Sequence, residues 1–590
     1  YDKGTISNVF KVVSEIELSY ENIGAFVRGT YFYDTENERG GPRDRTRLSP
    51  EALERVGSDV RLLDAYSWIN FDVGDMPAEI RAGQQVLSWG ESTFIQNSIN
   101  TINPVDVSAI RLPGGELREA LIPVPMVSGN IGLTENLSAE AFYQLRWEAT
   151  IPDPTGSYFG VSDIGAPGAE FVMLGFGAVP EGNFLDVRRS TTPRPDDQGQ
   201  FGLNFRYYTD LLGGTELGFY FVNYHSRLPI ASGRTTDLQG FGNAWAVGTG
   251  ATCLSGGCVP LGVPAGDRNA AIAAAVARGQ GEILGKGGSI DAAVTGELTA
   301  VATTVVDGLL AGQISAGDVP NLVTDQVADG SAYFTEYPED IKLYGISFNT
   351  TIGNTAVQGE YSFRQDVPLQ VDDVEVLFAA LSPLGQINPA ASVFGIFGQL
   401  GNFDVNTRIN GFKRLDVSQA QFTATHIFPR RFGADQLVVL GEFGFNWVHD
   451  MPAKDMLRFE GPGTYISGNG PLAATGAVHS PTAIGVIEDP SHFADDFSWG
   501  YRLIGALRYN NVFKGINLAP NIAWNHDVSG VSPGPGGNFL EGRKAYTLGL
   551  NASYQSSWEA QLKFTNFFGA DRYNLVHDRD LISLVVKYSF

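Results

Sequence analysis

The sequence predicts an all-β fold, a transmembrane antiparallel β-barrel of about 16–18 strands with short periplasmic turns and long extracellular loops. Three patterns support this prediction. Apolar residues alternate at spacing two, short connections alternate along the chain with long ones, and aromatic residues stand at the ends of the apolar columns. We expect residues 1–590 to form one outer-membrane barrel. A soluble β-sandwich, the competing interpretation, gives aromatic residues no reason to gather at strand ends.

Composition restricts the classes of function. The 590 residues include 65 Asp and Glu against 40 Lys and Arg, so the net charge is −25. Nucleic-acid binding needs a basic surface, and we therefore expect no nucleic-acid partner. The longest apolar run, at 270–277, is far shorter than the roughly 20 residues that a membrane-spanning helix needs. A protein of this kind is either soluble or crosses a membrane as a closed barrel.

Hairpins account for most of the chain. At eight places, two alternating segments meet at a short turn, as in AYTLGLNASY and WEAQLKF, which only three residues separate. The short turns are expected near residues 21–22, 74–78, 134–136, 210–215, 353–354, 429–435, 510–515 and 555–557. The long connections are expected at about 35–60, 90–125, 148–198, 227–339, 366–408, 449–497 and 569–580.

The last segment, LISLVVKYSF, adds one more strand. Its apolar column consists of Leu584, Val586, Tyr588 and Phe590. This raises the predicted count to 17, whereas single-chain bacterial barrels are even-numbered. We therefore expect a further strand upstream of Tyr1 and a total of about 18.

One long connection, residues 227–339, is expected to be an extracellular insertion with helices at about 266–315. Ala, Leu, Glu and Val predominate there, and Asp267 and Asp291 can cap helix N-termini. Two alternatives stay open: the helices cover the mouth of the barrel, or they form an insertion that has no role at the mouth.

The same connection holds the two cysteines of the chain, Cys253 and Cys258, in the sequence CLSGGC. A structural zinc site needs four ligands, so a small loop disulfide is the better prediction.

Residues 81–126 begin as a strand and then lose all periodicity. A polar segment with many Pro and Gly residues needs partners for its backbone groups, and the inner wall of a barrel can supply them. We therefore predict a luminal hatch or constriction over residues 90–125, with a mobile outer loop as the alternative. The predicted hatch and substrate path comprises Trp89, Gly90, Glu91, Asn97, Asn100, Asn103, Pro104, Asp106 and Pro113.

Catalytic and metal motifs were not found in the sequence. No GxSxG, Walker or dinucleotide-binding fingerprint occurs, and the seven His residues form no metal-binding pattern. We predict no enzyme activity, no cofactor and no metal site. The acidic pairs Asp372–Asp373 and Asp495–Asp496 are interpreted as solvated loop faces, with a surface Ca²⁺ site as the alternative.

Several stretches resemble the proteobacterial outer-membrane family called domain of unknown function 1302. They include RAGQQVLSWGESTFIQNSINTINPVD, LPGGELREALIPVPM, LTENLSAEAFYQLRW and the ending FGADRYNLVHDRDLISLVVKYSF. The resemblance implies a barrel in the outer membrane of a Gram-negative bacterium, in contact with lipid and lipopolysaccharide. It also implies that the alternating last strand, closed by Phe590, acts as the assembly signal at the periplasmic rim.

The resemblance further implies passage of hydrophobic small molecules or lipids, such as fatty acids or sterols, by loose analogy with FadL-type channels. A periplasmic or lipoprotein carrier and an inner-membrane transporter of the resistance-nodulation-division type are the implied partners. Two alternatives stay open: a general or cation-preferring porin for polar solutes, and a structural or adhesive surface barrel. The first hypothesis predicts an apolar path through the lumen, and the porin predicts a water-filled path lined by charged residues.

Overall fold

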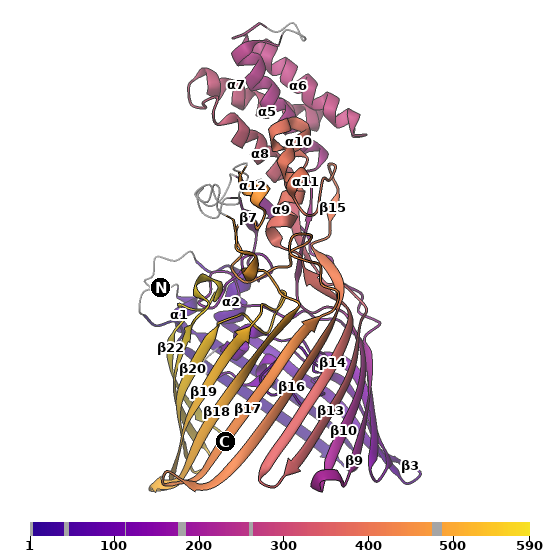
Figure 1. Ribbon diagram of the computed structural model, residues 1–590, viewed down its shortest axis with the longest axis vertical. Coiled ribbons are helices and arrows are strands. Elements are labelled where there is room, and N and C mark those ends of the chain that lie inside the picture. The colour runs from indigo at the N-terminus through magenta and orange to yellow at the C-terminus, as the bar shows by residue number, and fades with distance from the viewer. Residues whose placement is uncertain (1–3, 40–46, 112–113, 175–184, 259–263, 475–486) are drawn as a thin grey trace.

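A computed structural model describes residues 4–39, 47–111, 114–174, 185–258, 264–474 and 487–590. Seventeen strands, each antiparallel to its neighbours, form one sheet that curls into a barrel (Figure 1). They are β1 (Val9–Tyr20), β2 (Ile23–Asp34), β3 (Ser58–Val73), β4 (Met76–Gln85), β5 (Val124–Thr134), β6 (Leu137–Gln144), β9 (Phe201–Thr209), β10 (Thr215–Tyr224), β13 (Ile341–Ile352), β14 (Thr355–Gln370), β16 (Phe412–Arg431), β17 (Ala434–Val448), β18 (Phe497–Phe513), β19 (Ile516–Ser529), β20 (Lys544–Tyr554), β21 (Trp558–Phe568) and β22 (Leu581–Tyr588). The predicted fold class is confirmed.

The two ends of the barrel differ, as the alternation of connections predicts. Eight short turns lie at one end, which we call the turn end, and the long connections rise from the other, the loop end (Figure 1). Each barrel strand pairs with the barrel strand that precedes or follows it in the chain, in series from β1 to β22. One long connection was not predicted, residues 530–543 between β19 and β20.

The outer face of the barrel is apolar. In β22, Ile582, Leu584, Val586 and Tyr588 are 55–72% exposed, and Phe590 beyond the strand is fully exposed. The predicted apolar column therefore points away from the lumen, where a soluble protein would bury it. The same outward alternation recurs around the barrel, for example at Phe422, Phe443 and Leu548. A continuous exposed apolar belt of this kind is typical of strands that face hydrocarbon.

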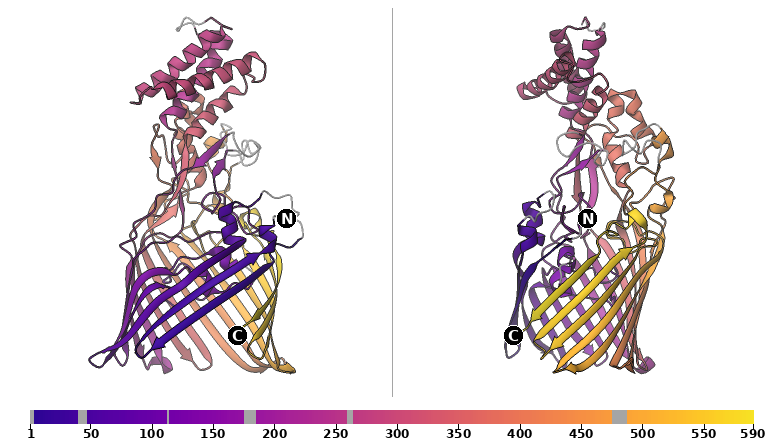
Figure 2. Two further views of the ribbon diagram at one scale, coloured as in Figure 1. Left: turned by 180° about the vertical axis from the view of Figure 1, so that it is seen from behind. Right: turned by 90° about the vertical axis from the view of Figure 1, so that its left-hand side faces the viewer.

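A second, smaller sheet stands above the loop end (Figure 2). Its five strands are β7 (Phe171–Met173), β8 (Asp186–Arg189), β11 (Ile230–Arg234), β12 (Ala332–Glu336) and β15 (Arg408–Ile409). The antiparallel pair β11 and β12 leads into and out of a group of four helices, which we call the helical head. Its helices are α5 (Leu238–Gly256), α6 (Arg268–Gly285), α7 (Ala292–Leu310) and α8 (Val319–Gly330). Of these, α7 is long and apolar enough to cross a membrane by length and composition, but it packs in the head.

The helical head is larger than predicted, because its first helix begins at residue 238 and its last ends at residue 330, and not at about 266 and 315. Helix α5 was missed because it is rich in Gly, which has a low helix propensity. In the structure, the absence of a side chain at Gly242 allows α6 to approach closely. A Cβ atom at Gly242 would lie 2.6 Å from Cδ1 of Ile283. Tertiary packing therefore overrides local propensity in this helix.

Cys253 and Cys258 are joined by a disulfide, with 4.7 Å between their Cα atoms. The prediction of a loop location was wrong for Cys253, which lies in the last turn of α5 and is buried. The disulfide therefore fixes the end of α5 to the chain that follows it.

The remaining helices are short and lie in the long connections. They are α1 (Thr35–Glu38), α2 (Pro50–Val56), α3 (Val107–Arg111), α4 (Leu117–Ala120), α9 (Asp373–Leu381), α10 (Leu384–Ile387), α11 (Val393–Phe397) and α12 (Gly470–Ala474), with 3₁₀ turns η1 (Leu211–Gly213), η3 (Pro389–Ser392), η5 (Pro490–His492) and η6 (Asp571–Tyr573). Except for η1, all of them belong to connections at the loop end or to the segment that enters the barrel.

Candidate functional site

The connection between β4 and β5 enters the barrel. We call residues 86–123 the luminal segment. The structure describes it except for residues 112–113. Its backbone and side chains bond to inward-facing residues of β6, β14, β16 and β17, which lie far from it in sequence. The segment therefore occupies the space that the barrel wall encloses.

Glu442 of β17 holds the middle of the luminal segment. Its carboxylate accepts hydrogen bonds from three consecutive backbone N–H groups, those of Thr93, Phe94 and Ile95, at 2.9, 2.8 and 2.9 Å. The side chain of Glu442 is 1% exposed. Hydrogen bonds from N–H groups to an ionised carboxylate are stronger than those between neutral groups. A single inward-facing acid thus satisfies a stretch of backbone that forms neither helix nor strand.

Glu360 of β14 makes a second contact of the same kind. It accepts hydrogen bonds from the N–H groups of Glu91, Ser92 and Ile99, the last two at 3.1 and 3.3 Å. Gly90 makes this close approach possible. Its φ is +92°, and a Cβ atom there would lie 2.5 Å from Oε2 of Glu360. Glycine is therefore required at position 90 both by backbone conformation and by space.

Glu140 of β6 accepts a hydrogen bond from the indole Nε1–H of Trp89 at 2.7 Å. The Trp89 ring is 1% exposed and packs against Phe142 and Tyr220, with centroids 5.1 and 6.0 Å away. The ring belongs to an apolar cluster between the luminal segment and the wall, which we call the luminal core. Its residues are Trp89, Ile99, Ile102, Val124, Met126, Phe142, Tyr220, Val222, Tyr224, Ile341 and Leu343.

Asn103 ties the two ends of the luminal segment together. Its Oδ1 accepts a hydrogen bond from the N–H of Leu87 at 2.9 Å, and its Nδ2 donates to the carbonyl groups of Gln85 and Ile122 at 3.1 and 3.0 Å. The carbonyl of Pro104 accepts a hydrogen bond from the N–H of Ile122 at 2.8 Å. These bonds hold the beginning and the end of the segment together, and we call this place its neck.

The other predicted hatch residues are more dispersed. Asn97 donates to the carbonyl of Gly536 at 2.8 Å, and Asn100 donates to the hydroxyl of Ser88 at 2.9 Å. Asp106 is buried and forms an ion pair with Arg61 of β3. Pro113 lies outside the described residues. Asn97 and Asp106 therefore connect the luminal segment to different parts of the barrel and its loops.

Helix α4 of the luminal segment and its N-cap residue, Glu116, contact the two end strands of the sheet. Glu119 pairs with Lys11 of β1 at 2.7 Å, and Glu116 pairs with Lys587 of β22 at 2.6 Å. The ends of the paired series are thus connected through the luminal segment.

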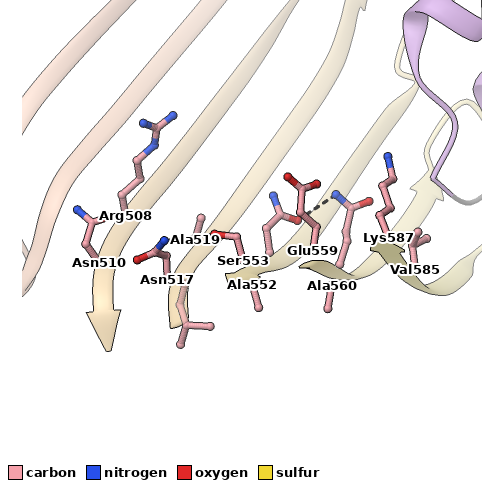
Figure 3. Close-up of a pocket in the computed structure, with 13 residues that line it drawn as sticks. Arg508, Asn510, Asn517, Ala519, Ala552, Ser553, Glu559, Ala560, Val585 and Lys587 are labelled. Atoms are coloured by element: carbon pink, nitrogen blue, oxygen red, sulfur yellow. Dashed lines mark hydrogen bonds between the residues drawn. The ribbon is translucent and has the colours of Figure 1, made fainter. Parts of the chain in front are cut away.

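A cavity of about 390 Å³ opens inside the barrel near the turn end (Figure 3). Most of its lining side chains are polar or charged. They include Arg508, Asn510, Asn517, Asn551, Ser553, Glu559, Gln561 and Lys587, from β18 to β22. Gln561 donates to Oδ1 of Asn551 at 2.9 Å. The part of the lumen that the luminal segment leaves open at this end is therefore suited to water and polar solutes.

The three glutamates that hold the luminal segment were not predicted. Each of them stands on the inward column of its strand, between outward apolar residues, and this alternation is visible in the sequence. The sequence does not reveal the backbone that they face. The interpretation of Asp372 and Asp373 as a solvated loop face was wrong for Asp372, which is 0% exposed, whereas Asp373 is partly exposed. The preceding residue, Val371, forms a β-bridge with Phe459 of the connection after β17, and this pairing places Asp372 beneath the loops.

Several solved structures align with this chain over most of its length at low sequence identity. OccAB1 of Acinetobacter baumannii has 7% identity and a TM-score of 0.34 over 96% of this chain and 86% of its own. The outer membrane protein OpdK of Pseudomonas aeruginosa has 7% identity and a TM-score of 0.35 over 98% and 92%. A BenF-like porin from Pseudomonas fluorescens has the same identity and TM-score over 99% and 91%.

No curated protein matches the sequence of this chain. The profile of one family, described as protein of unknown function (DUF1302), matches residues 1–590, as the resemblance predicted. The chain therefore belongs to the DUF1302 family.

Proposed function

We propose that this protein is an outer-membrane channel of a Gram-negative bacterium whose lumen is narrowed by the luminal segment. The observation that carries the proposal is the combination of an apolar outer face with an interior that contains a bonded segment and a polar cavity. A barrel with lipid-facing apolar residues and a polar interior is the architecture of an aqueous pore. In this proposal the loop end faces outward and the turn end faces the periplasm.

The polar lining of the cavity favours polar solutes as the molecules that pass. Arg508 and Glu559 bring opposite charges to its wall, and most of the neighbouring residues are Asn, Gln or Ser. Such groups hydrate a polar solute in transit, whereas an apolar solute gains nothing from them. Among the hypotheses that the sequence left open, this lining supports the porin.

Hydrophobic transport is kept as a second candidate because of one observation. The luminal core includes apolar side chains of the barrel wall, and apolar side chains of the luminal segment cover them. Displacement of the segment would expose this surface, and an apolar ligand could then gain roughly 25 cal/mol for each Å² that it buries there. This candidate would also need the periplasmic or lipoprotein carrier and the inner-membrane transporter that the resemblance implies.

Planar-bilayer recording of the purified protein tests the proposal. Stable, ohmic steps in the unmodified protein are expected for the polar pore. Near-silence combined with saturable binding of a fatty acid or sterol would favour the second candidate. Absence of both conductance and ligand binding would contradict channel function and favour a structural or adhesive barrel.

The role of the luminal segment is tested separately with Asn103→Ala, since Asn103 makes the three hydrogen bonds at the neck. We expect higher or more variable conductance than in the unmodified protein. The matched control is Asn100→Ala, which removes one hydrogen bond, to Ser88, on the same segment. Equal conductance in both variants and the unmodified protein would show that the segment does not limit the pore.

A further inference from the structure

Three carboxylates from two different loops converge above the barrel. Asp372 follows β14 and caps the N-terminus of α9, in which Asp373 is the first residue. Glu460 belongs to the connection between β17 and β18. One ligand atom from each of the three lies within 4.8 Å of the other two. The residues come from chain segments nearly 90 positions apart, so the tertiary fold brings them together.

The backbone fixes this arrangement. The N–H of Asp372 donates to the carbonyl of Arg458 at 3.1 Å, and the N–H of Glu460 donates to the carbonyl of Gln370 at 2.9 Å. The N–H of Asp373 donates to Oε2 of Glu460 at 2.9 Å. The carboxylates are therefore held in place by the pairing of the two loops.

The carboxylates in this region outnumber the positively charged side chains that pair with them. Arg458 pairs with Asp372 at 3.3 Å and also with Glu375, and all three side chains are at most 5% exposed. Within the described ranges, Arg458 is the only cation that forms an ion pair with Asp372, Asp373, Glu375 or Glu460. Four acids thus share one guanidinium. Buried carboxylates need compensation by a cation or by protons.

Asp373 supplies a second, independent observation. Its Oδ1 is inaccessible to solvent and has no hydrogen-bond partner among the described residues. An orphaned acceptor of this kind is costly to bury and points to a missing ligand.

We propose that Asp372, Asp373 and Glu460 bind one divalent cation, and that this cation is Ca²⁺. Carboxylate oxygens are the ligands that Ca²⁺ prefers, and oxygens bound at about 2.3–2.6 Å can lie up to roughly 5 Å apart. Calcium tolerates irregular geometry, whereas Mg²⁺ requires a near-ideal octahedron and retains water. The ion would join the connection after β14 to the connection after β17 and so stiffen the loop end.

The test uses the full chain, refolded without lipopolysaccharide into a detergent that has no phosphate group and freed of metal with EDTA. Calorimetric titration with CaCl₂ is expected to show one site per chain, and Ca²⁺ should raise the unfolding temperature. Asp373→Asn, which keeps the shape of the side chain, should weaken binding at least tenfold and remove the thermal shift. The matched control is Asp455→Asn, an exposed acid in the same connection as Glu460, and it should behave like the unmodified protein.

Two results would overturn the proposal that these residues form a cation site. One is the absence of Ca²⁺ binding by the unmodified protein, which would mean that the carboxylates carry protons. The other is binding that neither Asp373→Asn nor Glu460→Gln weakens, which would place the ion elsewhere. A preference for Mg²⁺ in competition would contradict the assignment to calcium. Because binding is measured directly, none of these results depends on whether the protein transports solutes.

Discussion

Oε2 of Glu360 lies 2.5 Å from the position that a Cβ atom would occupy at Gly90. Any side chain at position 90 must therefore move the luminal segment or break its bonds to Glu360. We expect Gly90→Ala to loosen the segment and to raise or destabilise single-channel conductance. Planar-bilayer recording measures this effect.

The control for Gly90→Ala is Gly74→Ala. Gly74 also has a positive φ, +67°, but lies in a turn with nothing within 4 Å of its Cβ position. Both substitutions carry the backbone cost of about 1–2 kcal/mol for a left-handed residue. A conductance change of the same size in both variants would attribute the effect to strain and not to the contact with Glu360.

Substitution of Glu442 by Ala removes the acceptor for the N–H groups of Thr93, Phe94 and Ile95. Ile95 is the buried member of the three, and a buried N–H group left without a partner costs about 1–3 kcal/mol. We expect hydrogen exchange of these three amides to accelerate by at least tenfold while the strand amides stay protected. The comparison is Glu559→Ala, an acid that lines the turn-end cavity and has no such role. Unchanged exchange in Glu442→Ala would contradict the anchoring role of the carboxylate.

Charge reversal at Arg508 should change ion selectivity. Its side chain points into the turn-end cavity (Figure 3). We expect Arg508→Glu to shift the reversal potential of a salt gradient toward cation selectivity, because a fixed charge beside a pore attracts its counter-ions. Lys514→Glu provides the control, since Lys514 lies at the exposed turn after the same strand. If both variants shift the potential equally, Arg508 has no special position in the conducting path.

The titration of Asp153 should make the free energy of unfolding of this protein depend on pH. It lies in the connection between β6 and β9, and burial raises its pKa from 3.8 to about 6, although Arg111, 3.1 Å away, opposes the shift. A carboxyl whose pKa is raised in the folded state favours folding when protonated. The contribution of protonated Asp153 to the stability of the fold is complete below about pH 3.8. It is lost as the pH rises through about 6.

We therefore expect Asp153→Asn to become more stable than the unmodified protein as the pH rises from 4 to 7. The difference should reach at most about 3 kcal/mol, the equivalent of a two-unit shift. Unfolding temperatures of both proteins across this range measure it. A difference that is constant with pH would show that Asp153 does not titrate in this window.

The helical head should be separable from the barrel. Arg234 of β11 and Ala332 of β12 are paired in the antiparallel sheet, so a short Asn-Gly turn can replace residues 235–331. We expect this variant to fold as a barrel with the same single-channel conductance, since the head contributes no barrel strand. Leu381 and Leu384, which pack against the head, would become exposed. The loop above the mouth that contains them would then be packed less tightly. Failure of the variant to form a heat-resistant barrel in detergent would show that the head is needed for folding.

The sequence by itself determined the barrel. Alternation at spacing two is a local property, because each strand must turn one column toward lipid and the other toward the interior. Leu584 and Val586 could therefore be assigned to the outer face without a structure, and the eight short turns could be placed from residues such as Gly353 and Asn354. The loss of periodicity after Gln85 likewise marked the segment that enters the lumen.

Only the tertiary structure decided which groups meet. Glu360 and Glu442 are ordinary inward-facing residues in the sequence, and their role arises because the barrel brings them beside N–H groups about 270 and 350 residues away. Asp372 and Asp373 look like a solvated pair in the sequence, but the fold buries Asp372 and brings Glu460 beside both of them. Contacts of this kind depend on the register of many strands at once, whereas the alternation within a strand depends on its own residues alone.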